Sequence, residues 1–343
     1  MNNFISKLKD KENLIKFADS QRALLMLIIL VFAFSLLSPY FLTLHNINTI
    51  LSGASLNAIV AIGFTLAFIL GQLDLSVGAM VMFSGMLAIG FQPTYGWAIS
   101  FMIAISSGFV VGLINGVLVA KLKIHSFIVT LGAMFILEGA MHLYSGGGSV
   151  FTTAFGMGDW LSTPVIPLLP PIVIITFIVV FGSAFILNKT RFGKGFFVVG
   201  GNPDAAWFAG LNRDLYIIIG FIISGVLSAL GGALFAMRMS SMTADAVLGM
   251  RTLMTVLAAV ILGGTSLSGG KGSIIKSFVG VLVLNTLYNG IGTLGLGFEV
   301  QMFANGLLLA LVVLYDAYAQ YKHDLLKGQR PHLLEELKEI KRG

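Results

Sequence analysis

Few residues in the long apolar stretches of this sequence have side chains that could bind a polar solute or move a proton. They are an aspartate, a glutamate, a histidine, an asparagine and three serines: Asp74, Ser76, Asn115, Glu138, His142, Ser266 and Ser268. A strongly polar or ionisable group inside an apolar span is costly, so each of them marks a candidate functional site. We expect these residues to line a path or gate for a polar solute.

Some of these residues have purely structural alternatives. Asp74 lies just before an apolar run, where a carboxylate can cap the N-terminus of a helix. Glu138 and His142 are four residues apart, so they share one helix face and could neutralise each other. For Asp74, a capping role and a gating role both stay open. For Glu138 and His142, a mutual pair and a contact with the solute both stay open.

Several kinds of chemistry are excluded by residue type and spacing. The chain contains no cysteine, so it forms no disulfide and uses no thiolate. No third histidine or carboxylate stands at ligand spacing from Glu138 and His142, so we expect no metal. GIGTLG at 290–295 lacks the flanking strand of a dinucleotide site, and TSLSGGKG at 265–272 lacks two key residues of a phosphate-binding loop. We therefore expect no cofactor and no catalytic residues.

The composition indicates which elements must position these side chains. Of the 343 residues, 57% are apolar and only 10% are charged, and the mean hydropathy is +0.93. Soluble proteins average about 25% charged residues. Because so few charges cannot cover a water-facing surface, the composition argues against a soluble enzyme or a nucleic-acid-binding protein. We predict an all-α polytopic membrane protein.

The apolar runs give ten candidate spans, since about 20 apolar residues cross a bilayer as a helix. They are residues 23–42, 50–71, 75–92, 95–119, 126–144, 168–188, 215–238, 251–268, 273–292 and 298–320. Several are short or broken by glycine, so eight to ten spans are compatible with the sequence. We expect an amphipathic segment over residues 1–22, a transmembrane domain over 23–320 and a charged tail over 321–343.

The orientation follows from the positions of the basic residues. With the N-terminus in the cytoplasm, 19 of the 21 Lys and Arg residues fall on the cytoplasmic side, as the positive-inside rule requires. We therefore predict ten spans with both termini in the cytoplasm. The net charge of +6 then reflects membrane topology, and no nucleic-acid partner is needed to explain it.

The sequence also contains a short repeat. AFILGQLDLSVG at 67–78 and AVILGGTSLSGG at 259–270 share seven of twelve residues at an offset of 192. Both copies lie where one span ends inside and the next begins, which predicts two parallel pseudo-repeats, as transporters often have. If so, Ser76 and Ser268 should be equally accessible from the cytoplasm. The glycines of GFVVGLING at 108–116 recur every four residues and predict a close-packing helix face.

The most informative segment is the polar loop 189–214. After two glycines, Asn202 suits a helix N-cap, Pro203 the first helical position, and Asp204 the positive end of the helix dipole. The helix that follows presents only small residues on one face: Ala205, Ala206, Ala209 and Gly210. A helix this short is not stable alone. It is either an interfacial loop helix or an element that fits a groove on a cytoplasmic partner.

Five segments in this order resemble one known family. They are GQLDLSVG at 71–78, LKIHSFIVTLGAMFILEG at 122–139, TRFGKGFFVVGGN at 190–202, GGNPDAAWFAGLN at 200–212 and ILGGTSLSGGKGS at 261–273. The chain resembles the permease subunits of ribose-, galactose- and xylose-type ABC importers over roughly residues 40–315. Many members have Glu-Leu-Asp where this chain has Leu253, Met254 and Thr255, which weakens any transfer of substrate.

The resemblance implies a set of partners. In that family two permease subunits pair, two cytoplasmic ATPase subunits grip their coupling loops, and an extracytoplasmic sugar-binding protein delivers the solute. By position, residues 202–210 would be the ATPase-docking helix, and Ser76 and Ser268 would lie at paired glycine-broken turns. The protein would be a multi-pass subunit of a bacterial inner membrane.

Two arginines break the positive-inside pattern. Arg238 and Arg251 flank a predicted outer segment that contains Asp245. They are either structural, as interfacial anchors or as an internal ion pair with Asp245, or docking residues for acidic patches on the binding protein, because arginine forms bidentate contacts with carboxylates.

The sequence thus predicts the permease subunit of an ATP-driven importer for a monosaccharide or similar small polar solute, working by alternating access. An ion-coupled secondary transporter is the alternative, and abundant intramembrane acids would favour it. A membrane enzyme would need a catalytic constellation that the sequence lacks.

Overall fold

The computed structural model describes residues 21–166, 169–297, 299–304, 306–308, 310, 311, 314 and 318. The chain divides into two compact units, residues 1–295 and 296–343, and the second is helical over most of its described part. The expected N-terminal segment lies outside the described residues except for its last two residues. The expected tail 321–343 lies wholly outside them.

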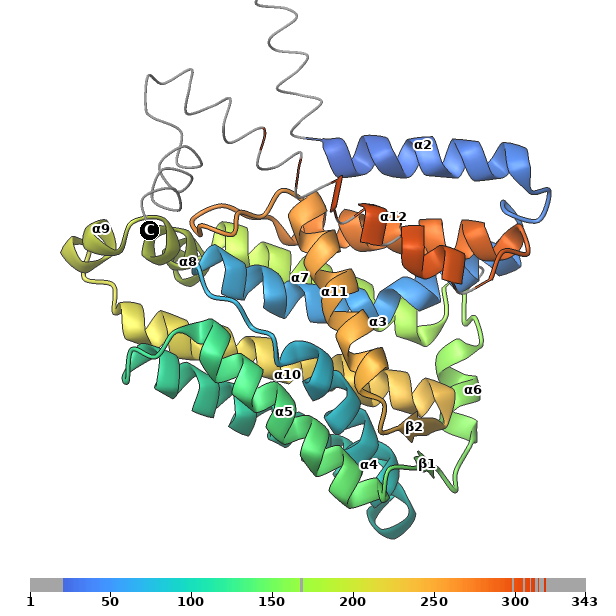
Figure 1. Cartoon of the computed structure of the whole chain (residues 1–343), viewed down its shortest axis with the longest axis horizontal. Coiled ribbons are helices and arrows are strands. Elements are labelled where there is room, and N and C mark those ends of the chain that lie inside the picture. Colours follow the sequence, from blue (N-terminus) through green and yellow to red (C-terminus); the bar gives the residue numbers. More distant parts are fainter. Residues whose placement is uncertain are drawn as a thin grey trace, which may run out of the picture. The chain divides into compact units, whose positions relative to one another are not determined.

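The first unit is a bundle of helices with one small sheet (Figure 1). Its longer helices are α2 (Arg22–Leu37), α3 (Leu44–Ile69), α4 (Val77–Ala120), α5 (Ser126–Ser145), α7 (Pro171–Lys189), α10 (Arg213–Met239), α11 (Ala246–Leu262) and α12 (Ile274–Thr293). Its short helices are α6 (Gly156–Ser162), α8 (Arg191–Gly201) and α9 (Pro203–Phe208). In the described part of the chain, α3, α4, α5, α7, α10 and α12 are the six helices long and apolar enough to cross a membrane. The predicted helical membrane architecture is confirmed in this form.

Two of the predicted spans are joined in α4. This helix has 44 residues, far more than the roughly 20 that cross a bilayer. It contains Pro93 and a non-helical residue, Gly96, with φ +73°, and Figure 1 shows the chain turning back there. The two arms therefore correspond to the predicted spans 75–92 and 95–119. α2 and α11, with 16 and 17 residues, are apolar but shorter than the six longer helices.

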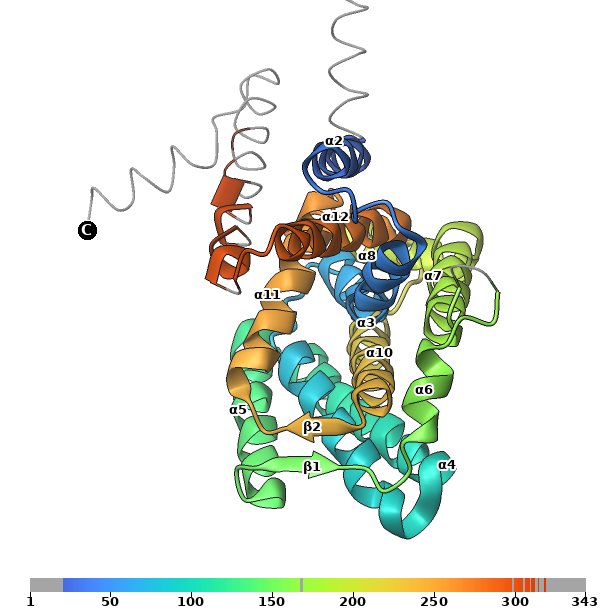
Figure 2. The same ribbon diagram turned by 90° about the vertical axis from the view of Figure 1, so that its right-hand side faces the viewer.

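One small sheet accompanies the helices of this predominantly helical unit. β1 (Ser149–Phe151) and β2 (Ser241–Thr243) form a two-stranded antiparallel sheet, in which Ser149 pairs with Thr243 (Figure 2). The hydroxyls of these two residues are 2.9 Å apart. Three-residue strands carry no recognisable alternation, and their pairing joins residues at least 90 positions apart, so local sequence could not reveal them.

The core is built on the contact between α4 and α10, which run side by side (Figure 1). The predicted glycine face of α4 lies in this contact. A Cβ atom at Gly108 would lie 2.3 Å from the Gly225 carbonyl oxygen, and one at Gly112 would lie 2.4 Å from the Phe221 carbonyl oxygen. The backbones approach this closely because no side chain separates them. The predicted close-packing role of these glycines is confirmed.

The functional segments gather at one end of the unit. Figure 1 shows α8, the turn between α3 and α4, and the turn between α11 and α12 at the same end. The β1–β2 sheet and α6 lie at the opposite end. This arrangement follows from the alternating directions of the long helices, because each long helix reverses the chain.

A substitution in the α4–α10 contact tests this packing. Gly112→Leu should lower the free energy of unfolding by about 1–3 kcal/mol, because a leucine side chain at this contact would force α4 and α10 apart. Thermal unfolding in detergent measures the effect. Gly182→Leu on α7 is the matched control, since a Cβ atom there would have no neighbour within 4 Å. Equal melting temperatures for the two variants would contradict the packing described.

Candidate functional site

Asp74 is the centre of a buried hydrogen-bond network. It lies in the first turn, which we define as residues 70–76, and is only 2% exposed. Its Oδ1 atom accepts hydrogen bonds from the Ser76 hydroxyl (2.5 Å) and the Ser76 N–H (3.1 Å). Its Oδ2 atom accepts one from the Ser224 hydroxyl of α10 (2.7 Å), and the Asn115 amide donates to Ser76 Oγ (3.2 Å). The structure thus brings together Asp74, Ser76 and Asn115, and adds Ser224.

This network supports the capping explanation and extends it. Ser76 is the N-cap of α4, and Asp74 accepts the hydrogen bond of its N–H group just before the helix begins. The second carboxylate oxygen binds α10, which is 150 residues away. Asp74 therefore both braces the start of α4 and ties the first turn to another helix.

The helices before the two repeated turns end in the same way. α3 is followed by Gly71 and α11 by Gly264; in each case the glycine N–H bonds the carbonyl three residues earlier, at 2.9 Å. The next N–H bonds the carbonyl five residues earlier, at 2.9 and 3.2 Å respectively. The two glycines have φ values of +69° and +81°, which other residues rarely adopt. At the offset of 192, however, Gly71 corresponds to Gly263, whose φ is −64°, and Gly264 corresponds to Gln72, so the two helix ends are shifted by one residue relative to the repeat.

The second turn, which we define as residues 263–273, also matches the first turn further on. Ser266 Oγ accepts the Ser268 N–H (3.2 Å), just as Asp74 accepts the Ser76 N–H. However, Ser76 is buried while Ser268 is exposed. The expectation of equal accessibility is therefore wrong: the Ser76 hydroxyl lies inside a buried network with Asp74 and Asn115, whereas Ser268 lies at the surface.

Glu138 and His142 lie apart from this network, on α5. Glu138 is half-buried and His142 is exposed, and no hydrogen bond or ion pair connects them in the described part of the chain. The expected mutual pair does not form. A spacing of four residues brings two side chains onto one helix face, but the side-chain conformations decide whether they meet.

The two outer arginines have partners inside the unit. Arg238, at the end of α10, donates to the Ser52 carbonyl oxygen of α3 (3.3 Å). The Arg251 guanidinium lies 5.3 Å from the centre of the Tyr288 ring of α12. Asp245 pairs with neither arginine, because its carboxylate caps α11 by accepting a backbone N–H (2.8 Å). The expected ion pair is therefore wrong, while the anchoring alternative agrees with these contacts.

The predicted cap of the short helix α9 is confirmed. The Asn202 side chain accepts the Ala205 N–H (2.9 Å), Pro203 occupies the first turn, and Asp204 follows it. The helix ends at Phe208, and the turn after it uses Gly210, whose φ is +71° and whose N–H donates to the Trp207 carbonyl (2.9 Å). The left-handed backbone conformation at Gly210 therefore favours glycine there, independently of any partner that binds the helix.

The outward face of α9 differs from the predicted one. Ala206 is completely buried, so it cannot contact a partner, whereas Ala205 and Ala209 are exposed. The most exposed large side chains are Trp207 (73%) and Phe208 (81%), whose ring centres lie 5.1 Å apart. Ala206 points inward because a six-residue helix needs one face to pack against the chain. An aromatic pair, and not a small-residue face, dominates the exposed surface.

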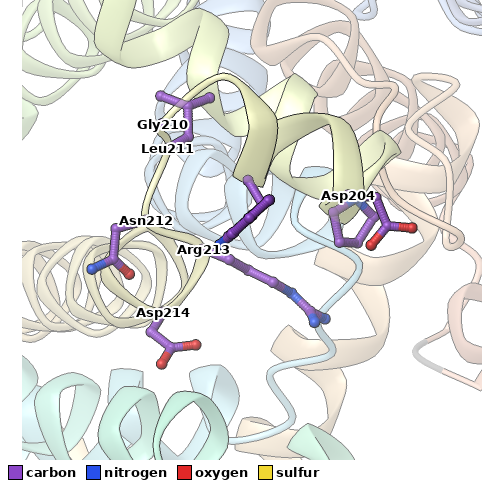
Figure 3. A pocket seen from close by; sticks show the side chains of 8 residues that line it. Asp204, Gly210, Leu211, Asn212, Arg213 and Asp214 are labelled. Carbon is purple, nitrogen blue, oxygen red and sulfur yellow. The ribbon is translucent and has the colours of Figure 1, made fainter.

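A groove of about 600 Å³ lies beside this helix (Figure 3). Its lining comes from α9 and the start of α10, and includes Pro203, Asp204, Trp207, Leu211, Asn212 and Arg213. Figure 3 shows the Arg213 side chain extending on the side of α9 that carries Asp204. Asp214 closes the groove and pairs with Lys121 (3.3 Å) and Lys123 (2.7 Å) from the loop after α4. These ion pairs hold the start of α10 in place.

Sequence reasoning missed Ser224, Trp207 and Phe208. No local signal marks Ser224, because its partner is distant in the chain. The aromatic pair carried a usable signal, since two adjacent large aromatic residues inside a capped polar loop cannot both be buried by a six-residue helix. Among the described residues, no group of three His, Asp or Glu side chains could hold a metal ion.

Residues 46–315 match the family described as branched-chain amino acid transport system / permease component. The chain belongs to this family. It is 35% identical to the ribose import permease protein of Escherichia coli K12, covering 86% of this chain and 93% of the relative. The D-allose and the galactose/methyl galactoside permease proteins of the same organism are 33% and 32% identical, covering 88% and 87% of this chain and 93% and 94% of each relative. No solved structure matches.

The family resolves several of the alternatives left open by the sequence. The chain is the permease component of an ABC importer, a transport subunit and not an enzyme, and a multi-pass protein of a bacterial inner membrane. Permeases of this kind work with ATPase and binding-protein partners. The ion-coupled alternative finds no support among the relatives.

The buried network yields a stability prediction. Ser224→Ala leaves one oxygen of Asp74 without its donor, and should lower the free energy of unfolding by about 1–3 kcal/mol. Thermal unfolding in detergent measures this loss. Ser107→Ala is the control, because the Ser107 hydroxyl bonds only a carbonyl of its own helix, that of Ala104. If both variants melt like the parent protein, the bond to Asp74 contributes nothing to stability.

Proposed function

We propose that this chain carries a monosaccharide across the bacterial inner membrane by alternating access, with α9 as the docking element for a cytoplasmic ATPase subunit. The exposed, fully capped α9 carries this proposal. A six-residue helix with Trp207 and Phe208 in solvent is costly unless a partner covers them, and aromatic residues are typical anchors of protein interfaces. The groove beside α9 offers an adjoining surface for the same partner.

The residues we assign to ATPase coupling are those of the capped helix and its end. Asn202, Pro203 and Asp204 form its start, and Ala205 and Ala209 lie on its exposed surface. The buried Ala206 packs it against the chain, and Gly210 forms the left-handed turn after it. Trp207 and Phe208 join this set as the contact residues. ATP-driven closure of the ATPase subunits would move α9, and the spans would then change between inward- and outward-open states.

The finer topology is part of this proposal. We infer ten spans with both termini in the cytoplasm and two parallel pseudo-repeats. The two arms of α4 form two of these spans, and α3, α5, α7, α10 and α12 form one each. The remaining three are α2, α11 and the segment 298–320. The positive-inside pattern and the gathering of the first turn, the second turn and α8 at one end support this inference (Figure 1). A second permease subunit would complete the transport path.

The sugar itself is proposed only as a class. The relatives named above carry ribose, allose and galactose or methyl galactoside in their names. Where many members have an acidic pair, Leu253 is buried and Thr255 bonds the Tyr288 hydroxyl (3.3 Å). Asp74, Ser76, Asn115, Glu138, His142, Ser266 and Ser268 stay candidates for the path or its gates.

Replacing the aromatic pair tests the docking proposal. The Trp207→Ala, Phe208→Ala double variant should lose sugar uptake and co-purification of the ATPase subunit by at least about tenfold, because truncating a central aromatic anchor costs about 2 kcal/mol or more. Phe185→Ala on α7 is the control, because it removes an exposed aromatic ring (64%) from a helix other than α9. Wild-type uptake and ATPase binding by the double variant would contradict the proposal.

Variants of Arg238 and Arg251 distinguish a structural anchoring role from a role in docking the binding protein. If Arg238 and Arg251 contact the binding protein, the double alanine variant should weaken its docking most at low salt, since exposed charges act mainly on association. Binding-protein titrations at two salt concentrations measure this. If docking and its salt dependence match the parent protein while the melting temperature falls, the arginines serve as anchors.

A further inference from the structure

The end of α8 touches the end of α3 through backbone alone. A Cβ atom at Gly200 would lie 1.7 Å from the Ile69 carbonyl oxygen and 2.9 Å from the Leu70 Cα atom. Only glycine fits here, because real Cβ contacts never come so close. α9 follows after one residue, Asn202, so the short helix is joined almost directly to this contact.

The second turn meets the same contact. The Gly270 N–H donates to the Ile69 carbonyl (2.8 Å). A Cβ atom at Gly269 would lie 2.5 Å from the Gly200 carbonyl oxygen and 3.1 Å from the Gly71 nitrogen. One at Gly270 would lie 2.5 Å from the Gly201 Cα atom. We call this meeting point of residues 69–71, 200–201 and 269–270 the glycine joint.

The first turn leads from the joint to three helices. Besides the Asp74 bond to α10 and the Ser76 bond to α4, its backbone is held by α5. The Leu73 N–H donates to Ser126 Oγ (3.1 Å), and the Leu75 N–H donates to Thr130 Oγ1 (3.0 Å). A displacement of this turn therefore acts on α4, α5 and α10 together.

The second turn connects the joint to a different set of helices. Ser277 Oγ of α12 lies 3.4 Å from Thr265 Oγ1 and accepts from Thr65 Oγ1 of α3 (2.8 Å). Arg22, at the start of α2, donates to the Ile261 and Leu262 carbonyls at the end of α11 (2.6 and 3.0 Å). This turn is thus linked to α3 and α12, and through the end of α11 to α2.

We propose that the glycine joint is the positioning element through which α9 moves both turns at once, so that one ATPase contact drives both groups of helices. This inference rests on the proposed function. A side chain between the segments would add a deformable layer, whereas backbone in van der Waals contact passes on small displacements, because packed interiors have little room to absorb them. The joint acts on coupling and leaves the ATPase contact itself, Trp207 and Phe208, unchanged.

Single alanine variants test the joint in proteoliposomes that contain the permease, its ATPase and its sugar-binding protein. Gly200→Ala and Gly269→Ala should reduce uptake and binding-protein-stimulated ATP hydrolysis by about tenfold, within the range of about 5–150-fold typical of coupling between sites. Basal ATP hydrolysis and co-purification of the ATPase should stay within about twofold. Gly201→Ala should give a smaller loss, because its Cβ atom would lie 3.3 Å from Gly270 Cα.

Gly139→Ala and Gly182→Ala are the matched controls, since a Cβ atom at either position would have no neighbour within 4 Å. If Gly200→Ala does not fold, Gly201→Ala decides the matter: reduced coupling supports the joint, and unchanged coupling overturns it. A purely structural role would lower the yield and the melting temperature while uptake per assembled complex stayed unchanged, and that result also overturns the proposal.

A second measurement reads out movement. The chain has no cysteine, so Ser268→Cys provides a single labelling site on the exposed part of the second turn. Its labelling rate by a thiol reagent should change when ATP is added to the assembled complex, and this change should disappear in the Gly200→Ala background. If the ATP-dependent change in labelling rate persists in the Gly200→Ala background, the role proposed for the glycine joint is overturned, while the proposed function stands. Failure of the unmodified permease to bind the ATPase or to take up sugar overturns the proposed function.

Discussion

The close approach of three backbone segments at Gly200, Gly269 and Ile69 is the constraint on which the rest of the arrangement depends. At this point the end of α8, the end of α3 and the second turn occupy a space that no side chain could share. Because the contact admits only glycine, the three segments keep one relative position. The polar networks that hold the two turns then follow from it, since each turn must satisfy its own buried hydrogen-bonding groups.

The buried polar groups of the unit are used to join helices. Asp74 connects the first turn to α10, while Thr265, Ser277 and Thr65 connect the second turn to α12 and α3. In an apolar surrounding an unpaired polar atom is costly, so a hydroxyl that bridges two helices strongly favours their native pairing. The solute path of a permease needs polar groups within its spans, and this structure satisfies several of them internally.

Local signals in the sequence predicted those parts of the site that depend on a few neighbouring residues. The Asn202–Pro203 cap, the glycine-rich helix face at 108–116 and the repeated turns all follow from backbone rules that act within one or two turns of helix. Prediction was wrong where a side chain's direction mattered. Ala206 was expected to face a partner but packs inward, and of the two alternatives for Glu138 and His142 the mutual pair does not form.

The sequence by itself determined the class of protein, its helical membrane architecture and the capped loop, because hydropathy and capping are properties of short segments. Only the tertiary structure decided that Ser224 completes the Asp74 network, that Ser76 is buried while Ser268 is exposed, and that both turns meet at Gly200. These features join residues up to 201 positions apart in the chain, as at Ile69 and Gly270. The packing of helices against one another, which no local pattern records, brings them within contact distance.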